Sequence, residues 1–360
     1  MTEPINLFLI STPLQLINVI EAKRELNIPD EHSVAIFITY SSNLITLKKI
    51  INGSQWKEMH FIDDDIESLR KHEKNFKNRK ILPVIKKAIA NLAKIKSLIR
   101  KFKEVDRLIV GYYLGMENLH MMNNIRYKSL YLLDDGIATI EVNERRKNNT
   151  SFLKNQSIEF YLKTWFKKYI FGYKLSHPTS VNFFTIYDIA VGPNDSIVKH
   201  NYTEVKKLIK GLEKTDEVFF LGQPLSEIHP EIVTEETYLH YLREIKKYFS
   251  KSNLVYIPHR DELPDKCSRI EKTLSIPIKR LDLPIELFLL NQIKKPCLLS
   301  GFITSALPNC KEIFGDELEI IAFRINPQKV ISKTMLVMVE NTYAYFEKIS
   351  NNKFKVISID

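Results

Sequence analysis

Two adjacent carboxylates follow an apolar run in the segment YLLDDGIATIEV (131–142). Asp134 and Asp135 stand at the end of a predicted strand, and Gly136 follows them. A nearby like charge raises the pKa of one carboxyl group of such a pair. A carboxylate of this kind can accept a proton from a hydroxyl nucleophile near neutral pH. The alternative is an Asp-Gly turn whose acids cap the next element.

A histidine and an arginine follow a second apolar run, in VYIPHRDE (255–262). His259 can donate a proton or a hydrogen bond to a departing phosphate, and Arg260 can neutralise that phosphate. The alternative is a histidine at the end of a strand that is bonded only to loop backbone.

Small and hydroxyl-bearing residues follow a third apolar run, in LLSGFITSALPN (298–309). Ser300 and Gly301 end the predicted strand, and Thr304 and Ser305 precede helix-like sequence. Hydroxyls and free amides at the start of a helix make an anion site. A simple capped helix is the alternative.

The segment FLGQPLSE (220–227) is a further exit from a strand into a loop. Gly222 would let the backbone approach a ligand closely, and Gln223 and Pro224 continue the same loop. Glu227 is a second candidate base, and a solvated loop acid is its alternative.

Apolar runs that alternate with helical patterns must position these residues. In the first half, a helix is predicted at 12–26, with Thr12 as N-cap and Pro13 at its first position. This places Ser11, Thr12 and Gln15 directly after the first strand. Strands are predicted at 5–11, 33–40, 107–113 and 129–135.

The second half shows the same alternation, with a helix at 234–250 and strands at 217–222, 253–259, 295–301 and 318–324. Continuous apolar strands separated by helices indicate parallel sheets covered on both faces. The sequence therefore predicts an α/β fold of two Rossmann-type, doubly wound domains, 1–190 and 191–360, facing each other across a cleft. Ligands of such sheets bind beyond the carboxyl ends of the strands, where all these polar groups lie.

Composition limits the class of protein. The 360 residues, 44% hydrophobic and 27% charged, fit two globular domains. The three cysteines, Cys267, Cys297 and Cys310, are widely spaced, which argues against a zinc site and suits a reducing compartment. The sequence shows no signal-peptide pattern and no long apolar run, so we expect a cytoplasmic protein.

Part of the net charge of +10 is local. Residues 71–106 carry 12 Lys or Arg against 3 Asp or Glu, and from residue 82 apolar residues recur at helical spacing. This pattern predicts a basic amphipathic helix. It is either a solvated helix packed on its own domain or a surface attracted to an anionic membrane or acceptor. No nucleic-acid-binding motif accompanies the charge, so we expect no nucleic-acid partner.

Two weaker patterns favour no site. The acidic string FIDDDIE (61–67) has an Asp-x-Asp spacing that can hold a metal ion bound to a nucleotide sugar, but the two-domain pattern argues against this use. Two His-Pro pairs, at 177–178 and 229–230, follow no apolar strand, and we assign both to loops.

Taken in order, the motifs STPLQL, LLDDG, LGQP, PHR and SG…TSAL resemble the bacterial lipooligosaccharide sialyltransferases, glycosyltransferase family 52. They also resemble the wider bacterial sialyltransferases and polysialyltransferases, which carry an acidic-acidic-Gly, a His-Pro and a Ser/Thr motif. The resemblance covers residues 9 to about 310.

The resemblance implies a GT-B-like fold and an inverting, metal-independent transfer from CMP-sialic acid to a glycan or glycolipid acceptor. It implies that His259 acts on the CMP leaving group and that Ser300, Thr304 and Ser305 bind its phosphate. Relatives suggest a homodimer.

Two departures from the family pattern matter. Leu225 follows Pro224 where family 52 has the acid proposed as its base, which leaves Asp135 and Glu227 as alternatives for the base. Arg260 stands in the place of the usual proline after the histidine. The basic helix could supply peripheral membrane attachment in place of the anchor that some relatives carry.

Three other functions remain open. The first is a similar transferase with another donor, such as a UDP-hexose. The second is a non-catalytic glycan-assembly protein that has kept the fold. The third is a nucleic-acid-binding protein, which charge alone suggests.

Overall fold

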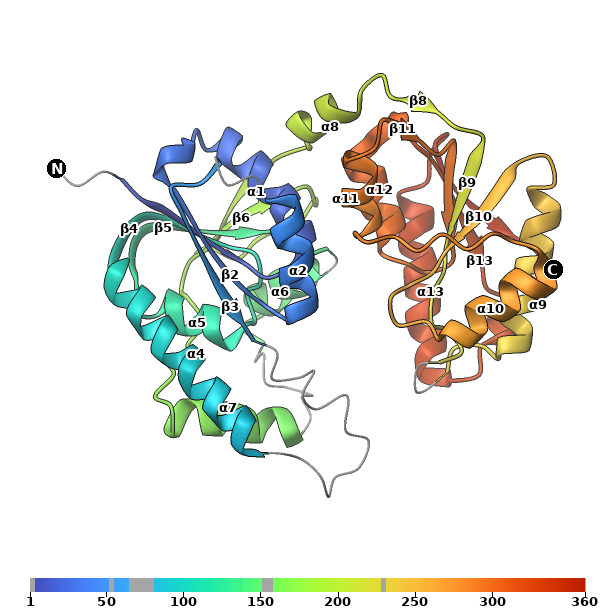
Figure 1. Ribbon diagram of the computed structural model, residues 1–360. Coiled ribbons are helices and arrows are strands. Elements are labelled where there is room, and N and C mark those ends of the chain that lie inside the picture. The colour runs from blue at the N-terminus through green and yellow to red at the C-terminus, as the bar shows by residue number, and fades with distance from the viewer. Residues whose placement is uncertain are drawn as a thin grey trace. The chain divides into compact units, whose positions relative to one another are not determined.

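The computed structural model describes residues 4–51, 55–64, 81–136, 138–150, 158–227 and 231–359. Two compact units divide the chain, residues 1–204 and 205–360 (Figure 1). We call them unit 1 and unit 2.

Unit 1 contains one parallel sheet of seven strands. Their order is β3 (Glu58–Asp63), β2 (Ser33–Thr39), β1 (Asn6–Ile10), β4 (Glu104–Val110), β5 (Arg126–Leu133), β6 (Asn182–Thr185) and β7 (Ser196–Lys199). The chain order reverses between β1 and β4, so this is the topological switch point at which doubly wound sheets bind ligands.

Side chains of β1 alternate between two hydrophobic clusters, because successive residues of a strand face opposite sides of the sheet. Leu7 and Leu9 belong to one cluster with residues of α4 (Ile81–Lys101) and α5 (Met116–Met122). Phe8 and Ile10 belong to the other with residues of α1 (Pro13–Glu25) and α2 (Ser41–Ile50). Helices therefore cover both faces (Figure 1).

The remaining segments of unit 1 are a short 3-10 turn (Asp30–His32), α6 (Ala138–Lys147) and α7 (Ile158–Tyr169). Helix α8 (Thr203–Ile209) begins in unit 1 and continues into unit 2.

Unit 2 has a five-stranded parallel sheet in the order β10 (Asn253–Ile257), β9 (Glu217–Leu221), β12 (Leu298–Gly301), β13 (Glu319–Arg324) and β14 (Phe354–Ser358). Its switch point lies between β9 and β12. Strands β8 (Glu213–Lys214) and β11 (Lys294–Lys295) form a separate pair. The helices are α9 (Glu235–Tyr248), α10 (Pro264–Leu274), α11 (Ile285–Leu290), α12 (Ala306–Phe314) and α13 (Lys333–Lys348), with 3-10 turns Gly315–Glu317 and Pro327–Lys329.

The predicted α/β class and the two Rossmann-type, doubly wound units are confirmed. The division differs from the predicted one after residue 190, because β7 pairs with β6 and so belongs to the first sheet. The stretch 145–190, which looked irregular in sequence, contains α7 and β6.

Candidate functional site

A buried glutamine occupies the switch point of unit 1. Gln15 lies in the first turn of α1, where its backbone N–H completes a capping box with Thr12. Its Oε1 accepts hydrogen bonds from the backbone N–H groups of Ser11, at 2.7 Å, and Thr12, at 3.3 Å. A Cβ on Gly111, just past β4, would lie 2.2 Å from this oxygen. Only glycine there lets the glutamine lie between the ends of β1 and β4.

Asp135 is the group that Gln15 positions. Gln15 Nε2 donates to Asp135 Oδ1 at 2.9 Å, and the Asp135 backbone N–H donates to Thr139 Oγ1 at 2.8 Å. Burial raises the pKa of the Asp135 carboxyl above its ordinary value of 3.8; the Gln15 hydrogen bond opposes this rise, and the Asp134 charge adds to it. A half-buried carboxylate with a raised pKa is suited to accept a proton.

Asp134 makes structural contacts within unit 1, and its predicted substrate contact stays a prediction. Its side chain is buried, with 2% of the residue exposed, and Oδ2 accepts the Ile186 N–H at 2.8 Å. Its backbone carbonyl accepts from Asn18 Nδ2 at 2.6 Å, and the His200 ring lies 3.8 Å from Oδ2. Asp134 therefore ties β5 to α1 and to the segment after β6.

The small residues around this pair set the local backbone. Gly136 has φ of +63°, in the left-handed region that favours glycine, so the backbone turns here as the alternative interpretation of the Asp-Gly pair expects. Ser11 and Thr12 donate their amides to Gln15. Gln15 therefore positions Asp135, and the predicted substrate contacts of these three residues stay predictions.

A large cavity opens at the same edge of unit 1. Its volume is about 1220 Å³, and its lining includes Tyr40 and Tyr112, which follow β2 and β4. Side chains of α5 and α7 and the last turn of α6 complete the wall. Several of the lining residues are basic: Arg145, Arg146, Lys147, Lys167, Lys168 and Lys174.

A second glutamine lies at the switch point of unit 2. Gln223 Oε1 accepts the Ile303 N–H at 3.0 Å, which joins the loops after β9 and β12. Its backbone N–H donates to Tyr238 Oη at 3.1 Å. Gln223 thus holds two candidate loops together, and Pro224 continues the first of them.

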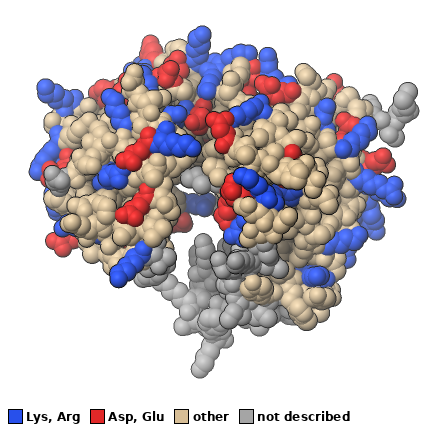
Figure 2. Space-filling model, turned by 180° about the vertical axis from the view of Figure 1, so that it is seen from behind, with Lys and Arg blue, Asp and Glu red and all other residues tan. Residues whose placement is uncertain are grey.

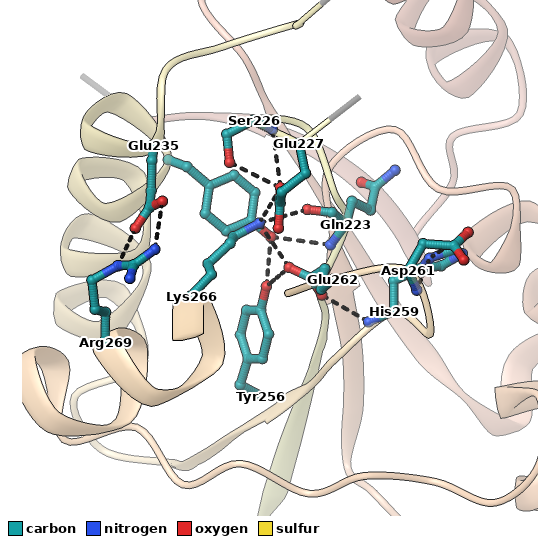
Figure 3. A network of polar contacts seen from close by, with 11 residues as sticks. Gln223, Ser226, Glu227, Glu235, Tyr256, His259, Asp261, Glu262, Lys266 and Arg269 are labelled. Atoms are coloured by element: carbon teal, nitrogen blue, oxygen red, sulfur yellow. Dashed lines mark hydrogen bonds and ion pairs between the residues drawn. The ribbon is translucent and has the colours of Figure 1, made fainter. Parts of the chain in front are cut away.

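A buried lysine that sequence reasoning missed connects the loops after β9 and β10 (Figure 3). Lys266 is 0% exposed, and its ammonium donates to the Gln223 carbonyl at 2.9 Å. It also contacts Glu227 Oε2 at 3.1 Å and Glu262 Oε1 at 2.8 Å, and lies 3.8 Å from the Tyr238 ring centroid. Three acceptors match the three N–H donors of an ammonium group, as burial of its charge requires.

Glu262 extends this network to the histidine loop. Its Oε2 accepts the His259 backbone N–H at 2.7 Å, and its Oε1 accepts Tyr256 Oη–H at 2.6 Å. Tyr256 Oη lies 2.8 Å from Tyr238 Oη. Burial raises the pKa of both tyrosines well above the ordinary value, so both stay neutral hydrogen-bonding groups.

Gly222 and Glu227 serve this network. A Cβ on Gly222 would lie 2.4 Å from both Glu262 Oε2 and Tyr256 Oη, so glycine lets these two side chains approach the backbone closely. Glu227 Oε2 pairs with Lys266 and accepts from Ser226 Oγ at 2.9 Å. One oxygen of Glu227, Oε2, is engaged by Lys266 and Ser226, and the other, Oε1, is buried, which argues against Glu227 as the base.

The side chains of His259 and Arg260 remain accessible, with 43% and 75% exposed. His259 Nδ1 accepts the Asp261 N–H at 3.2 Å and lies 3.7 Å from Asp261 Oδ2. Nδ1 therefore carries a lone pair, and Nε2 is the ring nitrogen left to donate to a ligand.

The hydroxyl motif after β12 divides into a buried and an accessible part. Ser300 is 0% exposed because it lies in β12 between β9 and β13, and its predicted contact with the donor phosphate stays a prediction. Gly301 is also buried. A Cβ added to it would lie 3.2 Å from the Leu221 carbonyl oxygen. Thr304 and Ser305 precede α12, where Thr304 Oγ1 accepts the Ala306 N–H at 3.3 Å and Ser305 is exposed.

Charge does not gather into one patch on the face in Figure 2, where basic and acidic side chains are interspersed. Among the described residues, no three His, Cys, Asp or Glu side chains form a metal-binding group. Within the same residues, no helix is both long and apolar enough to span a bilayer. His177 lies in a loop as predicted, whereas His229-Pro230 and residues 65–67 of the acidic string lie outside the described residues.

No protein-family model and no curated protein matches this sequence. Solved structures similar to the chain include an α/β-galactoside α-2,3-sialyltransferase of Photobacterium phosphoreum, at 14% identity, 99% coverage of each chain and a TM-score of 0.49. A sialyltransferase of Photobacterium damsela is 11% identical, with 99% and 82% coverage and a TM-score of 0.47. MurG of Acinetobacter baumannii is 9% identical, with 99% and 86% coverage and a TM-score of 0.41. At identities and TM-scores this low, we draw no argument from these similarities.

Proposed function

We propose that the protein is an inverting glycosyltransferase that moves sialic acid from CMP-sialic acid to a terminal sugar hydroxyl of a bacterial surface glycan. Lipooligosaccharide, O-antigen and capsule are the candidate acceptors. The observation that carries the proposal is Asp135, a carboxyl group with a raised pKa, held by Gln15 at the switch point of a Rossmann-type sheet.

The proposed reaction uses Asp135 as general base. The bond between the sialyl carbon and the phosphate oxygen breaks, and its electron pair leaves with CMP. The acceptor oxygen forms the new bond from the opposite face and gives its proton to Asp135. Burial favours the neutral form of this carboxyl, which supports its role as a proton acceptor.

Unit 2 supplies the proposed donor contacts. His259 Nε2 would donate to the departing phosphate, and Arg260 would neutralise it. Thr304 and Ser305 would add hydroxyl and backbone donors at the start of α12. The Lys266 network supports this assignment because Glu262, which pairs with Lys266, accepts the backbone N–H of His259 and holds the histidine loop in place. A preorganised site requires such support.

The remaining expectations belong to the same proposal: a reaction without a metal cofactor, a homodimer, and a cytoplasmic enzyme attached peripherally to the membrane. The contacts of α4 indicate which of its basic residues could face the lipid. Lys87 pairs with Asp63 at 3.0 Å and Lys94 donates to the Phe61 carbonyl, so Lys86, Lys96 and Arg100 are the better lipid-facing candidates.

Donor binding tests the assignment against its alternatives. We expect CMP to raise the melting temperature more than UDP does, and Arg260→Ala to remove much of the CMP effect. A larger effect of UDP would favour a UDP-hexose donor. Binding of CMP without turnover, and an unchanged cellular glycan in a His259→Ala strain, would favour a non-catalytic assembly protein.

A further inference from the structure

Three buried polar side chains of unit 1 lie behind the aspartate pair. Asn18 belongs to α1, whereas His200 and Tyr202 belong to residues 200–202, which we call the β7–α8 segment. Tyr202 Oη donates to Asn18 Oδ1 at 2.6 Å, and Asn18 Nδ2 donates to the Asp134 carbonyl at 2.6 Å. Two short hydrogen bonds therefore join this segment to the peptide between Asp134 and Asp135.

That peptide sets the orientation of Asp135. A peptide unit is planar, so a contact that holds the Asp134 carbonyl also holds the N–H of Asp135. This N–H donates to Thr139 Oγ1 at 2.8 Å, and Gln15 bonds to the Asp135 carboxylate. Gln15 and Asn18 are three residues apart and lie on the buried side of α1. One side of α1 thus holds Asp135 at both its peptide and its carboxyl group.

Tyr202 adopts a backbone conformation that is unusual for an aromatic residue. Its φ is +55°, in the left-handed region that favours glycine. Such a conformation costs free energy and persists where the surroundings over-determine it. The hydrogen bond to Asn18 is one such contact, and the His200 ring, 4.8 Å away between centroids, is another. His200 in turn stacks on Phe184 of β6 at 4.2 Å. This packing directs the Tyr202 hydroxyl at Asn18.

His200 presents an unsatisfied imidazole to the Asp134 carboxylate. Its side chain is 0% exposed, and neither ring nitrogen has a hydrogen-bond partner among the described residues. Nε2 lies 3.8 Å from Asp134 Oδ2, and Asp134 Oδ1 has no partner in the same part of the chain. Buried polar atoms without partners are rare, because each costs free energy. A shift of about 1 Å would bring Nε2 within hydrogen-bonding distance of Oδ2.

We propose that Asn18, His200 and Tyr202 are positioning residues for Asp135. Asn18 and Tyr202 hold the peptide that precedes Asp135, and His200 bonds to the Asp134 carboxylate when the β7–α8 segment shifts towards it. The role of Asp135 as base rests on the proposed function, whereas the positioning is a property of unit 1 alone. The geometry of the base then depends on the segment through which the chain leaves unit 1.

Conservative substitutions test the positioning. Tyr202→Phe removes the hydroxyl and keeps the ring. His200→Phe removes both ring nitrogens and keeps a ring that can stack on Phe184. The matched control is Tyr343→Phe in unit 2, because the Tyr343 hydroxyl is also buried and donates to the Phe323 carbonyl at 2.7 Å.

Hydrogen exchange of peptides that contain residues 131–136 measures the positioning without any substrate. We expect exchange there to be about tenfold faster in Tyr202→Phe than in wild type, because the peptide before Asp135 loses its support. Exchange in Tyr343→Phe should equal that of wild type. Equal exchange in Tyr202→Phe and wild type would overturn the proposal.

Transfer rates distinguish positioning from a purely structural role. Tyr202→Phe should lower kcat about tenfold and leave the KM of donor and acceptor within about twofold. Adding Tyr202→Phe to Asn18→Ala should cause no further loss, because the two residues act through one chain of hydrogen bonds. Tyr343→Phe should lower the melting temperature by a similar amount and keep the wild-type kcat. A wild-type kcat in Tyr202→Phe, or additive losses in the double variant, would overturn the proposal.

His200→Phe should separate stability from activity. Removal of two unsatisfied buried nitrogens should not lower the melting temperature, whereas loss of the contact with Asp134 should lower kcat about threefold or more. A wild-type kcat in His200→Phe would contradict the role of His200. If wild type transfers sugar to no acceptor, the proposed function fails, and hydrogen exchange alone then decides the positioning.

Discussion

Replacing the two adjacent aspartates one at a time should have opposite effects on stability. Asp135→Asn keeps an oxygen that can accept from Gln15 Nε2 but removes a half-buried charge. Asp134→Ala removes the acceptor of the buried Ile186 N–H. The first change should abolish catalysis in an intact protein, and the second should weaken the fold.

The expected signs follow from linkage. The pKa of Asp135 is higher in the folded chain than its ordinary value of 3.8, so its contribution to stability is full below 3.8 and is lost as pH rises through the folded pKa. At neutral pH the wild type therefore bears the cost of a desolvated carboxylate. Asp135→Asn should be more stable than wild type at pH 7, and the difference should narrow as the pH falls towards 3.8.

The magnitudes differ as well. Loss of a general base should lower the transfer rate by about 10²- to 10⁴-fold. Loss of the Asp134 acceptor should cost about 1–3 kcal/mol, because a buried donor is left unsatisfied. In a domain of this size, each kcal/mol lowers the melting temperature by about 2–4 °C.

Denaturant unfolding and transfer rates, measured on the same preparations between about pH 4 and about 8, give both readouts. The wild-type transfer rate should fall on the acid side at a pH above the ordinary pKa range of an aspartate, because Asp135 must be ionised to act as a base. An Asp135→Asn enzyme with near wild-type activity would refute the reasoning. So would an Asp134→Ala protein that is as stable as wild type.

Three further predictions concern the rest of the molecule. Lys266→Met should destabilise unit 2 by about 3–5 kcal/mol by leaving buried carboxylates unpaired, whereas Lys272→Met on the exposed side of α10 should leave denaturant unfolding unchanged. Gly222→Ala should cost about 1–3 kcal/mol from the clash with Glu262 and Tyr256, and a melting temperature equal to wild type would contradict that packing. Charge reversal of Lys86, Lys96 and Arg100 on α4 should weaken sedimentation with anionic vesicles. Unchanged sedimentation would exclude a role of α4 in membrane attachment.

Local sequence signals were sufficient for much of the fold. Apolar runs such as 33–40 predicted buried strands, and the Thr12-Pro13 pair predicted the start of α1 with its cap. The two compact units divide at residue 204 and not after residue 190, and the sequence did not indicate this because β7, with the pattern SIVK, is short and mostly exposed. No apolar run marks it, and only its pairing with β6 assigns it to the first sheet.

The candidate residues lie at strand ends as expected, but their roles depend on contacts that sequence does not encode locally. Which aspartate of the pair is buried depends on Asn18 and on Ile186, 52 residues further along the chain. Lys266 could not have been found, because a lysine in a polar helical segment normally faces solvent. Asn18 follows Gln15 by three residues on the buried side of α1, and this helical spacing was the one available signal.

Release of CMP from CMP-sialic acid, in EDTA, with and without a lactose-type acceptor, tests the central claim most directly. The account predicts release that the acceptor stimulates, that persists in EDTA, and that Asp135→Asn abolishes while Glu227→Gln retains it. No release, together with no binding of CMP by calorimetry, would contradict the donor assignment. Loss of activity in Glu227→Gln with retention in Asp135→Asn would contradict the choice of base.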